Sequence, residues 1–284
     1  MCRFLLYKGP DILLSELITK PHHSLIKQSY CARERPEPLN GDGFGIGWYA
    51  PRVSPEPCLF TSITPAWANQ NLKRLVDKIR SPCIVAHLRA ASKGLVVTEL
   101  NCHPFQYGPL LWMHNGEISE FAKIKRRIRE SLKDEYYNII QGTTDSEHAF
   151  ALFLNFLQCK PEEASADDFV EAIRETIHFL EKCSKEAGIR EVSYYNFAVT
   201  NGFDIVVTRY SSNPEVKPET LYYTICHDVE THDGICEISR SHGIHPAVII
   251  ASEPITLERK GWLRIPRNQM LVVSETMRVK TSRL

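Results

Sequence analysis

The sequence contains no apolar run that approaches the length of a membrane span, and its longest short runs cover residues 203–207 and 247–251. A helix that crosses a bilayer needs about 20 consecutive apolar residues. The apolar part of the first segment, MCRFLLYK, is also too short to act as a secretion signal. These absences predict a soluble, cytoplasmic protein that has no membrane partner.

The chain also lacks net charge, because its 34 lysine and arginine residues balance its 34 aspartate and glutamate residues. A neutral chain has no overall field to hold an anionic polymer, so we exclude nucleic acid as a partner. One local stretch is strongly basic, and its charges fit the solvated face of a helix better than a nucleic-acid surface. This stretch contains Lys123, Lys125, Arg126, Arg127 and Arg129.

Nine cysteines are present, but no two of them form a C-x-x-C pair. An odd number of cysteines without a secretion signal indicates reduced thiols and not a disulfide framework. Their spacing also argues against a structural zinc site where possible ligands gather, so we predict a polar hairpin and loop there and no metal. These possible ligands are Cys226, His227, His232, Cys236, His242 and His245.

At 284 residues the chain has the length of about two domains, yet it contains no flexible linker, repeat or low-complexity tract. Hydrophobic periodicity predicts strands, then two central helices, then strands again, which indicates one layered α+β domain over residues 1–284. The expected strands cover 3–8, 83–88, 110–114, 196–200, 203–208, 221–226, 248–251 and 270–274. The expected helices cover 11–18, 72–79, 121–132, 149–157 and 167–186.

Three local patterns refine this prediction. Thr144 and Glu147 have the spacing of a capping box, and the apolar residues 149–157 that follow predict a buried central helix. Residues 20–42 are rich in proline, arginine and polar side chains, so we expect a long loop. The glycines of 41–47 lead into a strand without the G-x-G-x-x-G spacing, so a nucleotide-phosphate loop is not expected.

Cys2 occupies the most informative position in the chain. If Met1 is removed, the thiol and a free α-amino group belong to the same residue. An α-amine with a pKa of about 7.7–8.0 can act as general base for a thiol with a pKa of about 8.5. The position therefore predicts an N-terminal nucleophile, although a cysteine at position 2 can also be no more than the start of a strand.

Four further segments supply the other groups that an acyl-transfer site needs. Arg89, in HLRAAS, offers a fork for a carboxylate, and Asp145, in GTTDSE, offers a counter-charge for a cation. Asn115 and Gly116, in HNG, offer an amide and a backbone N–H to a developing oxyanion. His103 lies in the rigid turn of NCHPF. Taken singly, Arg89 is also consistent with a surface ion pair and Asp145 with a helix cap.

Taken in order, an N-terminal Cys, H-x-R, H-P, H-N-G and T-D-S-E resemble the class II glutamine amidotransferase family, whose catalytic domains are N-terminal-nucleophile hydrolases. Near the C-terminus, ASEPIT with Trp262 is similar to the free-standing branch of that family, which includes γ-glutamyl hydrolases of glutathione breakdown and ergothioneine synthesis. One departure is that Leu39-Asn40-Gly41 precedes Asp42, where synthase-linked members have an Arg-Gly pair. This loop is therefore assigned no catalytic residue.

The resemblance implies a four-layer αββα sandwich and a hydrolase that cleaves a γ-glutamyl amide bond through a thioester. The bond would belong to glutamine or to a γ-glutamyl peptide or thiol conjugate. The implied catalytic residues are Cys2 as nucleophile and Asn115 with Gly116 as oxyanion hole. The implied substrate-binding residues are Arg89 and Ser92 at the glutamyl carboxylate, Asp145 at the amine and His103 as support of the pocket. No metal or organic cofactor is implied.

Two other functions stay open. One is a glutaminase subunit that supplies ammonia to a separate synthase chain, and the other is a non-catalytic interaction protein with the same fold. The expected ligand is a small γ-glutamyl molecule, with a partner protein or a second copy of the chain left open. We expect the loops at 20–42 and 226–245 to line the mouth of the pocket.

Overall fold

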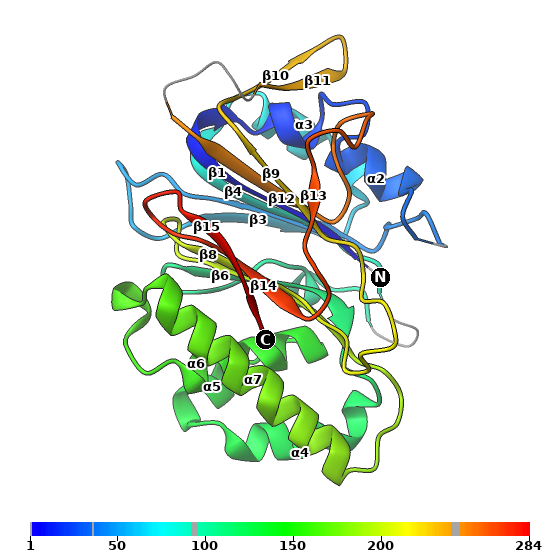
Figure 1. Ribbon diagram of the computed structural model, residues 1–284, viewed down its shortest axis with the longest axis vertical. Coiled ribbons are helices and arrows are strands. Elements are labelled where there is room, and N and C mark those ends of the chain that lie inside the picture. The colour runs from blue at the N-terminus through cyan, green and yellow to red at the C-terminus, as the bar shows by residue number, and fades with distance from the viewer. Residues whose placement is uncertain (1, 36, 92–95, 240–244) are drawn as a thin grey trace.

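The computed structural model describes residues 2–35, 37–91, 96–239 and 245–284, and its two main β-sheets lie face to face between two layers of helices (Figure 1). One sheet is covered by α1 (Ser15–Ile18), α2 (Leu25–Cys31) and α3 (Gln70–Val76). The other is covered by α4 (Phe121–Ser131), α5 (Asp134–Asn138), α6 (Asp145–Phe156) and α7 (Ala166–Glu186). This order confirms the predicted α+β class and its αββα layers, whereas the assignment of all residues to one domain stays a prediction.

The first sheet, which we call the β1 sheet, has the strand order β13-β9-β12-β1-β4-β2-β3 within the described residues. Its strands are β1 (Arg3–Leu13), β2 (Phe44–Trp48), β3 (Cys58–Ser62), β4 (Arg80–Leu88), β9 (Tyr222–Cys226), β12 (Ala247–Ala251) and β13 (Leu263–Arg264). Phe4 and Leu6 lie in the core between the two sheets, whereas Leu5 and Tyr7 lie in the core beneath the first helix layer. Because side chains alternate along a strand, Cys2 belongs to the face of Phe4, toward the second sheet.

The second sheet, the β6 sheet, has the order β15-β14-β8-β7-β6-β5 within the described residues. Its strands are β5 (Phe105–Tyr107), β6 (Leu110–Glu117), β7 (Tyr194–Thr200), β8 (Ile205–Arg209), β14 (Gln269–Val273) and β15 (Val279–Arg283). The predicted hairpin at Asn201-Gly202 is confirmed, since the Asn201 side chain accepts hydrogen bonds from the N–H groups of Phe203 and Asp204 at 2.9 and 2.7 Å. Asn115 and Gly116 lie inside β6, which continues past the predicted end at 114.

A separate hairpin of β10 (Asp228–His232) and β11 (Ile235–Ser239) projects beyond the β1 sheet (Figure 1). It confirms the polar hairpin predicted in this part of the chain. In the described ranges, no group of three or more His, Cys, Asp or Glu side chains is arranged to hold a metal ion. Of the six possible zinc ligands, Cys226 and Cys236 are buried, and His242 lies outside the described residues.

Two predictions near the N-terminus are wrong. The helix predicted over 11–18 begins only at Ser15, because β1 resumes its pairing with β4 at Ile12 after an irregularity that follows Lys8. The loop predicted over 20–42 contains α2, whose first turn is capped by Ser24 Oγ, which accepts from the N–H of Lys27 at 3.3 Å. In both segments tertiary pairing and one cap outweigh the local composition.

The buried central helix is confirmed as α6, and its cap differs from the prediction in one detail. Thr144 Oγ1 accepts from the N–H of Glu147 at 3.1 Å, as a capping box requires. The Glu147 carboxylate does not return to Thr144 but accepts from the N–H groups of Gln141 and Gly142 at 2.9 and 2.8 Å. Glu147 therefore anchors the turn before the helix, and this turn positions Asp145.

The basic stretch lies on the outer face of α4, and much of its charge is paired. Ion pairs join Lys123 to Glu120, Arg126 to Glu130 and Arg127 to Glu186. These pairs are what a solvated helix face shows. In the described ranges, no helix is both long and apolar enough to cross a membrane.

Candidate active site

Cys2 lies half-buried at the start of β1, beside the end of β4. Its Sγ atom is 3.6 Å from the carbonyl oxygen of Ala90 and accepts from the Ala90 N–H at 3.4 Å. The carbonyl of Cys2 accepts from Arg3 Nη1 at 3.0 Å. The thiol is therefore held against main chain of the neighbouring strand and not in the apolar core.

A buried ionic cluster fixes the chain behind Cys2. Arg3 is fully buried, and its Nε donates to Glu253 Oε1 at 2.9 Å. Glu253 Oε2 also accepts from His23 Nε2 at 2.8 Å and from the Arg33 N–H at 2.9 Å. Burial alone would raise the pKa of this carboxyl, but the hydrogen bond from His23, the charge of Arg3 and two backbone N–H groups together lower it to about 2. The Glu253 carboxylate is therefore ionised at neutral pH, and its hydrogen bonds hold the first residues of β1 in place.

Asn115 connects the β6 sheet to the β1 sheet at the level of Cys2. Its Nδ2 donates to Ser252 Oγ at 3.4 Å, and this oxygen also accepts from the N–H of Phe4 at 3.1 Å. An amide nitrogen carries two hydrogens, so one remains for a ligand. Gly116 follows, and a Cβ there would lie 1.9 Å from the carbonyl oxygen of Tyr194, so only glycine fits.

Arg89 follows the end of β4 and is 3% exposed. Its guanidinium donates at long distance to two carbonyl oxygens, those of Asp42 at 3.5 Å and Val96 at 3.4 Å. It forms no ion pair within the described residues, because the nearby Asp42 carboxylate accepts from the N–H of Ala91 at 2.8 Å instead. A buried guanidinium without a counter-charge is suited to bind an anion.

Asp145 begins α6 and joins it to the end of β6. Its Oδ2 accepts from the N–H of Ile118 at 2.8 Å, and its Oδ1 accepts from the N–H of Ser146 at the same distance. Both oxygens keep further lone pairs, and the side chain is partly exposed. Through its bond to Ile118, the Asp145 carboxylate is held next to the main chain two residues after Gly116. Ser92, the other predicted carboxylate contact, lies outside the described residues.

His103 lies behind these groups, in a stack of histidines between the sheets. Its ring is 4.2 Å from the ring of His87, which in turn lies 3.2 Å from the carbonyl oxygen of His114. Burial lowers the pKa of His103 well below 6.5 and that of His87 to about 3. Both rings are therefore neutral at pH 7, and His103 has no charge to offer a substrate.

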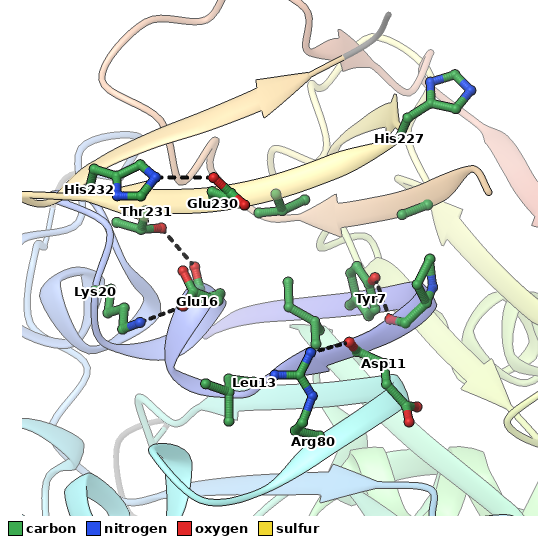
Figure 2. A pocket seen from close by; sticks show the side chains of 14 residues that line it. Tyr7, Asp11, Leu13, Glu16, Lys20, Arg80, His227, Glu230, Thr231 and His232 are labelled. Carbon is green, nitrogen blue, oxygen red and sulfur yellow. Dashed lines mark hydrogen bonds and ion pairs between the residues drawn. The ribbon is translucent and has the colours of Figure 1, made fainter. Parts of the chain in front are cut away.

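The prediction that the segment 226–245 lines the pocket mouth is wrong. Cys226 pairs with Ala247 and Val248 pairs with Lys8, so this segment leaves the sheet at the end of β1 opposite to Cys2. A hollow of about 410 Å³ lies there, between β10 and the distal part of β1 (Figure 2). The segment 20–42, in contrast, does reach the Cys2 end, because the carbonyl of Glu34 accepts from Arg3 Nη2 at 3.3 Å.

One cationic residue near Cys2 was missed by sequence reasoning. The Arg35 side chain is 4% exposed, and its Nη1 donates to Asn40 Oδ1 at 2.5 Å. Burial, followed by the charge of Arg3, lowers the pKa of this guanidinium. Asn40 is itself buried and bonded to α2 through the carbonyl of Gln28, so the loop without an assigned role is a rigid support. No local motif marks Arg35, because only the folded loop brings it here.

Sequence comparison connects this arrangement to known proteins. The family described as glutamine amidotransferases class-II matches residues 15–283. The chain is 43% identical over 294 residues to "Probable glutamine amidotransferase DUG3" of Saccharomyces cerevisiae, with 97% of this chain and 82% of that protein covered. It is 32% identical over 119 residues to "Gamma-glutamyl-hercynylcysteine sulfoxide hydrolase" of Mycobacterium tuberculosis, with 42% of this chain and 50% of that protein covered.

Solved structures share the fold along the whole chain. A glutamine aminotransferase class-II domain protein from Silicibacter pomeroyi has a TM-score of 0.68 at 23% identity, with 99% of each chain covered. The glutamine phosphoribosylpyrophosphate amidotransferase of Bacillus subtilis has a TM-score of 0.62 at 15% identity over 99% of this chain and 49% of its own. At these identities the likeness concerns the fold alone, which is that of N-terminal-nucleophile hydrolases, as predicted.

Proposed function

The chain belongs to the class II glutamine amidotransferases, and from this premise we propose that it hydrolyses the amide bond of a γ-glutamyl compound. Members of this family are amidohydrolases with an N-terminal cysteine. The finer statement, that the leaving amine belongs to a peptide or thiol conjugate, is our proposal. The name of one relative supports this finer statement, since it is a hydrolase of a γ-glutamyl thiol-derived compound.

One observation carries the proposal: the thiol of Cys2, the amide of Asn115 and the guanidinium of Arg89, which has no ion pair among the described residues, lie at one end of the facing sheets. Cys2 and Arg89 come from the β1 sheet, and Asn115 comes from the β6 sheet. Ser252 connects the Asn115 amide to the first strand at 3.4 Å. A binding protein without chemistry would not need a half-buried thiol opposite a buried amide donor.

The proposed reaction begins after removal of Met1, which lies outside the described residues. The α-amine of Cys2 takes the thiol proton, and Sγ forms a bond to the γ-carbonyl carbon. The Asn115 amide and the Gly116 N–H stabilise the oxyanion until the C–N bond breaks and the leaving amine takes the proton. Water then attacks the thioester, releases glutamate and restores the thiol. No metal or cofactor takes part in this scheme.

Two charged side chains of the protein would recognise the glutamyl end of the substrate. Arg89 has no ion pair among the described residues and only two long hydrogen bonds to carbonyl oxygens, so its guanidinium would bind the α-carboxylate of the substrate. Asp145 supplies a counter-charge for the α-ammonium group. We propose that Ser92 assists Arg89 and that His103 supports the pocket from behind. This clamp fixes the glutamyl half and leaves the amine half to other parts of the surface.

The test is steady-state kinetics on glutamine beside γ-glutamyl peptides, with Cys2→Ala as the inactive control. A higher kcat/KM for a peptide than for glutamine supports the hydrolase. A clear preference for glutamine, with ammonia release that rises only when a second protein is added, would favour an ammonia-supplying subunit instead. Release of no product from any γ-glutamyl compound would favour a non-catalytic role.

A further inference from the structure

His114 is a buried side chain that the proposed reaction does not use, and it lies between the strand of the oxyanion hole and the helix of Asp145. The side chain is 1% exposed. Its Nε2 lies 2.9 Å from the carbonyl oxygen of Tyr194, and its Nδ1 lies 2.9 Å from Ser146 Oγ. One ring therefore connects β6 with β7 and with the first turn of α6.

These two partners fix which ring nitrogen of His114 carries the hydrogen. A carbonyl oxygen can only accept, so Nε2 donates to the carbonyl of Tyr194. Burial lowers the pKa of His114, although Asp145 and the Tyr194 carbonyl act in the opposite direction, so the ring is neutral at pH 7. A neutral ring has a single N–H, so Nδ1 accepts and the Ser146 hydroxyl donates to it.

The direction of this hydrogen bond determines what the Asp145 carboxylate can still accept. Ser146 Oγ is 3.2 Å from Asp145 Oδ1, but its one hydrogen is directed to His114. Among the described residues, Oδ1 is then left with the N–H of Ser146, and Oδ2 accepts from the N–H of Ile118, both at 2.8 Å. Each carboxylate oxygen keeps a lone pair that can face an ammonium group.

Two hydrogen bonds hold the start of α6 against the end of β6. One runs from the Ile118 N–H to the Asp145 carboxylate, and the other runs from the Ser146 hydroxyl to His114. Asp145 is the first residue of α6 and Ser146 is the second, so a movement of this turn would move the carboxylate. The bond between Ser146 and His114 therefore restrains the position of the Asp145 carboxylate.

The same ring lies beside Gly116, the second member of the proposed oxyanion hole. A Cβ at Gly116 would lie 2.5 Å from His114 Nε2 and 1.9 Å from the Tyr194 carbonyl oxygen, so the ring and this carbonyl fill the space of a side chain. The main-chain carbonyl of His114 accepts from His87 Nε2 at 3.2 Å. Side-chain and main-chain contacts thus fix β6 on both sides of Asn115.

We propose that His114 is a positioning residue that, through Ser146 and Tyr194, holds the ammonium-binding carboxylate and the oxyanion hole at a fixed spacing. This inference rests on the proposed function. Neither His114 nor Ser146 touches the substrate in this account, so neither is a catalytic residue. A displacement of about 1 Å in a group that binds a substrate can cost about 100-fold in rate. Loss of the Ser146 bond should therefore weaken recognition of the ammonium group.

The experiment measures competitive inhibition by glutamate and by glutarate, which lacks the α-ammonium group, during hydrolysis of one γ-glutamyl substrate. The wild-type enzyme should bind glutamate more tightly than glutarate. Ser146→Ala should raise the inhibition constant of glutamate about tenfold, because the Asp145 carboxylate is displaced. The inhibition constant of glutarate and kcat should stay unchanged. Ser146→Thr, which keeps a hydroxyl group, should recover most of the loss.

His114→Phe keeps an aromatic ring beside Gly116 but loses both hydrogen bonds. It should raise the inhibition constant of glutamate as Ser146→Ala does. It should also lower kcat about tenfold, because the Tyr194 carbonyl beside Gly116 loses its donor. In the double variant the rise for glutamate should be no larger than in His114→Phe alone, since both substitutions break the same bond.

Ser184→Ala is the matched control and should change no constant, because Ser184 is a buried serine of α7 whose Oγ bonds to no described residue. Equal rises for glutamate and glutarate in Ser146→Ala, or additive effects in the double variant, would overturn the inference while leaving γ-glutamyl hydrolysis intact. Equal binding of the two inhibitors by the wild type would overturn it as well. Absence of turnover of any γ-glutamyl compound would contradict the proposed function and the inference together.

Discussion

The ion pairs near the two ends of β1 differ in how deeply they are buried. At the Cys2 end, Arg3 and Glu253 are buried to 1% exposure or less and are joined at 2.9 Å. At the far end, the Lys20–Glu16 pair lies at the surface, at the edge of the hollow between β10 and β1 (Figure 2). This hollow thus carries ordinary surface charges, whereas the predicted chemistry lies where charged side chains are buried.

The difference follows from the cost of desolvation. A charge taken out of water destabilises the fold unless its hydrogen bonds and counter-charges are complete. Glu253 meets this condition with Arg3, His23 and two backbone N–H groups. Arg89 has no acidic partner within the described residues, and this supports our proposal that it binds the substrate carboxylate. A buried charge whose partners are complete, such as Glu253, supports the fold. A buried charge without a counter-charge is a better indication of a binding site than the volume of a cavity.

The largest effect is expected at Cys2. Cys2→Ala should lower turnover at least about a thousandfold, because the nucleophile is lost. The melting temperature should change little, since both hydrogen bonds that Sγ forms within the described residues join it to the main chain of Ala90. Cys58→Ala, at an exposed cysteine of β3, is the matched control and should keep full activity. Hydrolysis by the Cys2 variant at the wild-type rate would place the chemistry elsewhere.

The next effect concerns the proposed clamp. Arg89→Lys keeps the charge but loses the two-pronged fork, so KM for every γ-glutamyl substrate should rise by about 10- to 100-fold. Asp145→Asn should have a similar effect, because the substrate ammonium loses its counter-charge. Steady-state kinetics on glutamine checks both. Normal KM in both variants would refute the assignment of these two residues.

The third effect concerns the stability of the fold and not the reaction. Glu253→Gln should lower the free energy of unfolding at pH 7 by about 3 kcal/mol, because the buried charge of Arg3 then keeps only the more distant Glu219, at 3.5 Å, as a counter-charge. The folded pKa of Glu253, about 2, is below an unfolded value of about 4.3. Its stabilisation is therefore complete above that unfolded pKa and is lost as pH falls toward 2.

Denaturant unfolding from pH 7 down to pH 3 measures this change. The difference between wild type and Glu253→Gln should shrink as the solution becomes more acidic. Glu37→Gln, whose side chain is 88% exposed, provides the matched control and should leave stability nearly unchanged at every pH. A constant difference across the pH range would show that Glu253 is not ionised in the fold.

The smallest effect is expected at the far end of β1. Lys20→Ala removes a surface pair with Glu16 and should cost less than about 1 kcal/mol of stability. The value of kcat/KM for any γ-glutamyl substrate should be unchanged. A loss of activity comparable to that of the Arg89 and Asp145 variants would mean that the hollow between β10 and β1 takes part in the reaction.

Much of the fold followed from the sequence, and the predicted site residues came from short motifs. The strand at 110–114 and the H-N-G motif located Asn115 and Gly116, because the motif lies inside one element. The strand hairpin at Asn201-Gly202 was predictable for the same reason. Each of these features is set by residues close together in the chain.

Features that depend on distant pairing were not predictable. Arg3 and Glu253 are 250 positions apart, and neither residue's own segment reveals the other. The wrong placement of segment 226–245 has the same origin, since only the register of β9 on β12 decides at which end the hairpin lies. Arg35 likewise reaches the Cys2 end only after its loop has folded against the β1 sheet.

The central claim, an N-terminal Cys2 that forms a thioester, is tested most directly by intact-mass spectrometry of active enzyme quenched with acid during turnover of a γ-glutamyl substrate. The account predicts chains that lack Met1 and carry one glutamyl group, with cleavage mapping that group to Cys2 and none present on Cys2→Ala. Full activity from chains that keep Met1, or a glutamyl group on another residue, would contradict it.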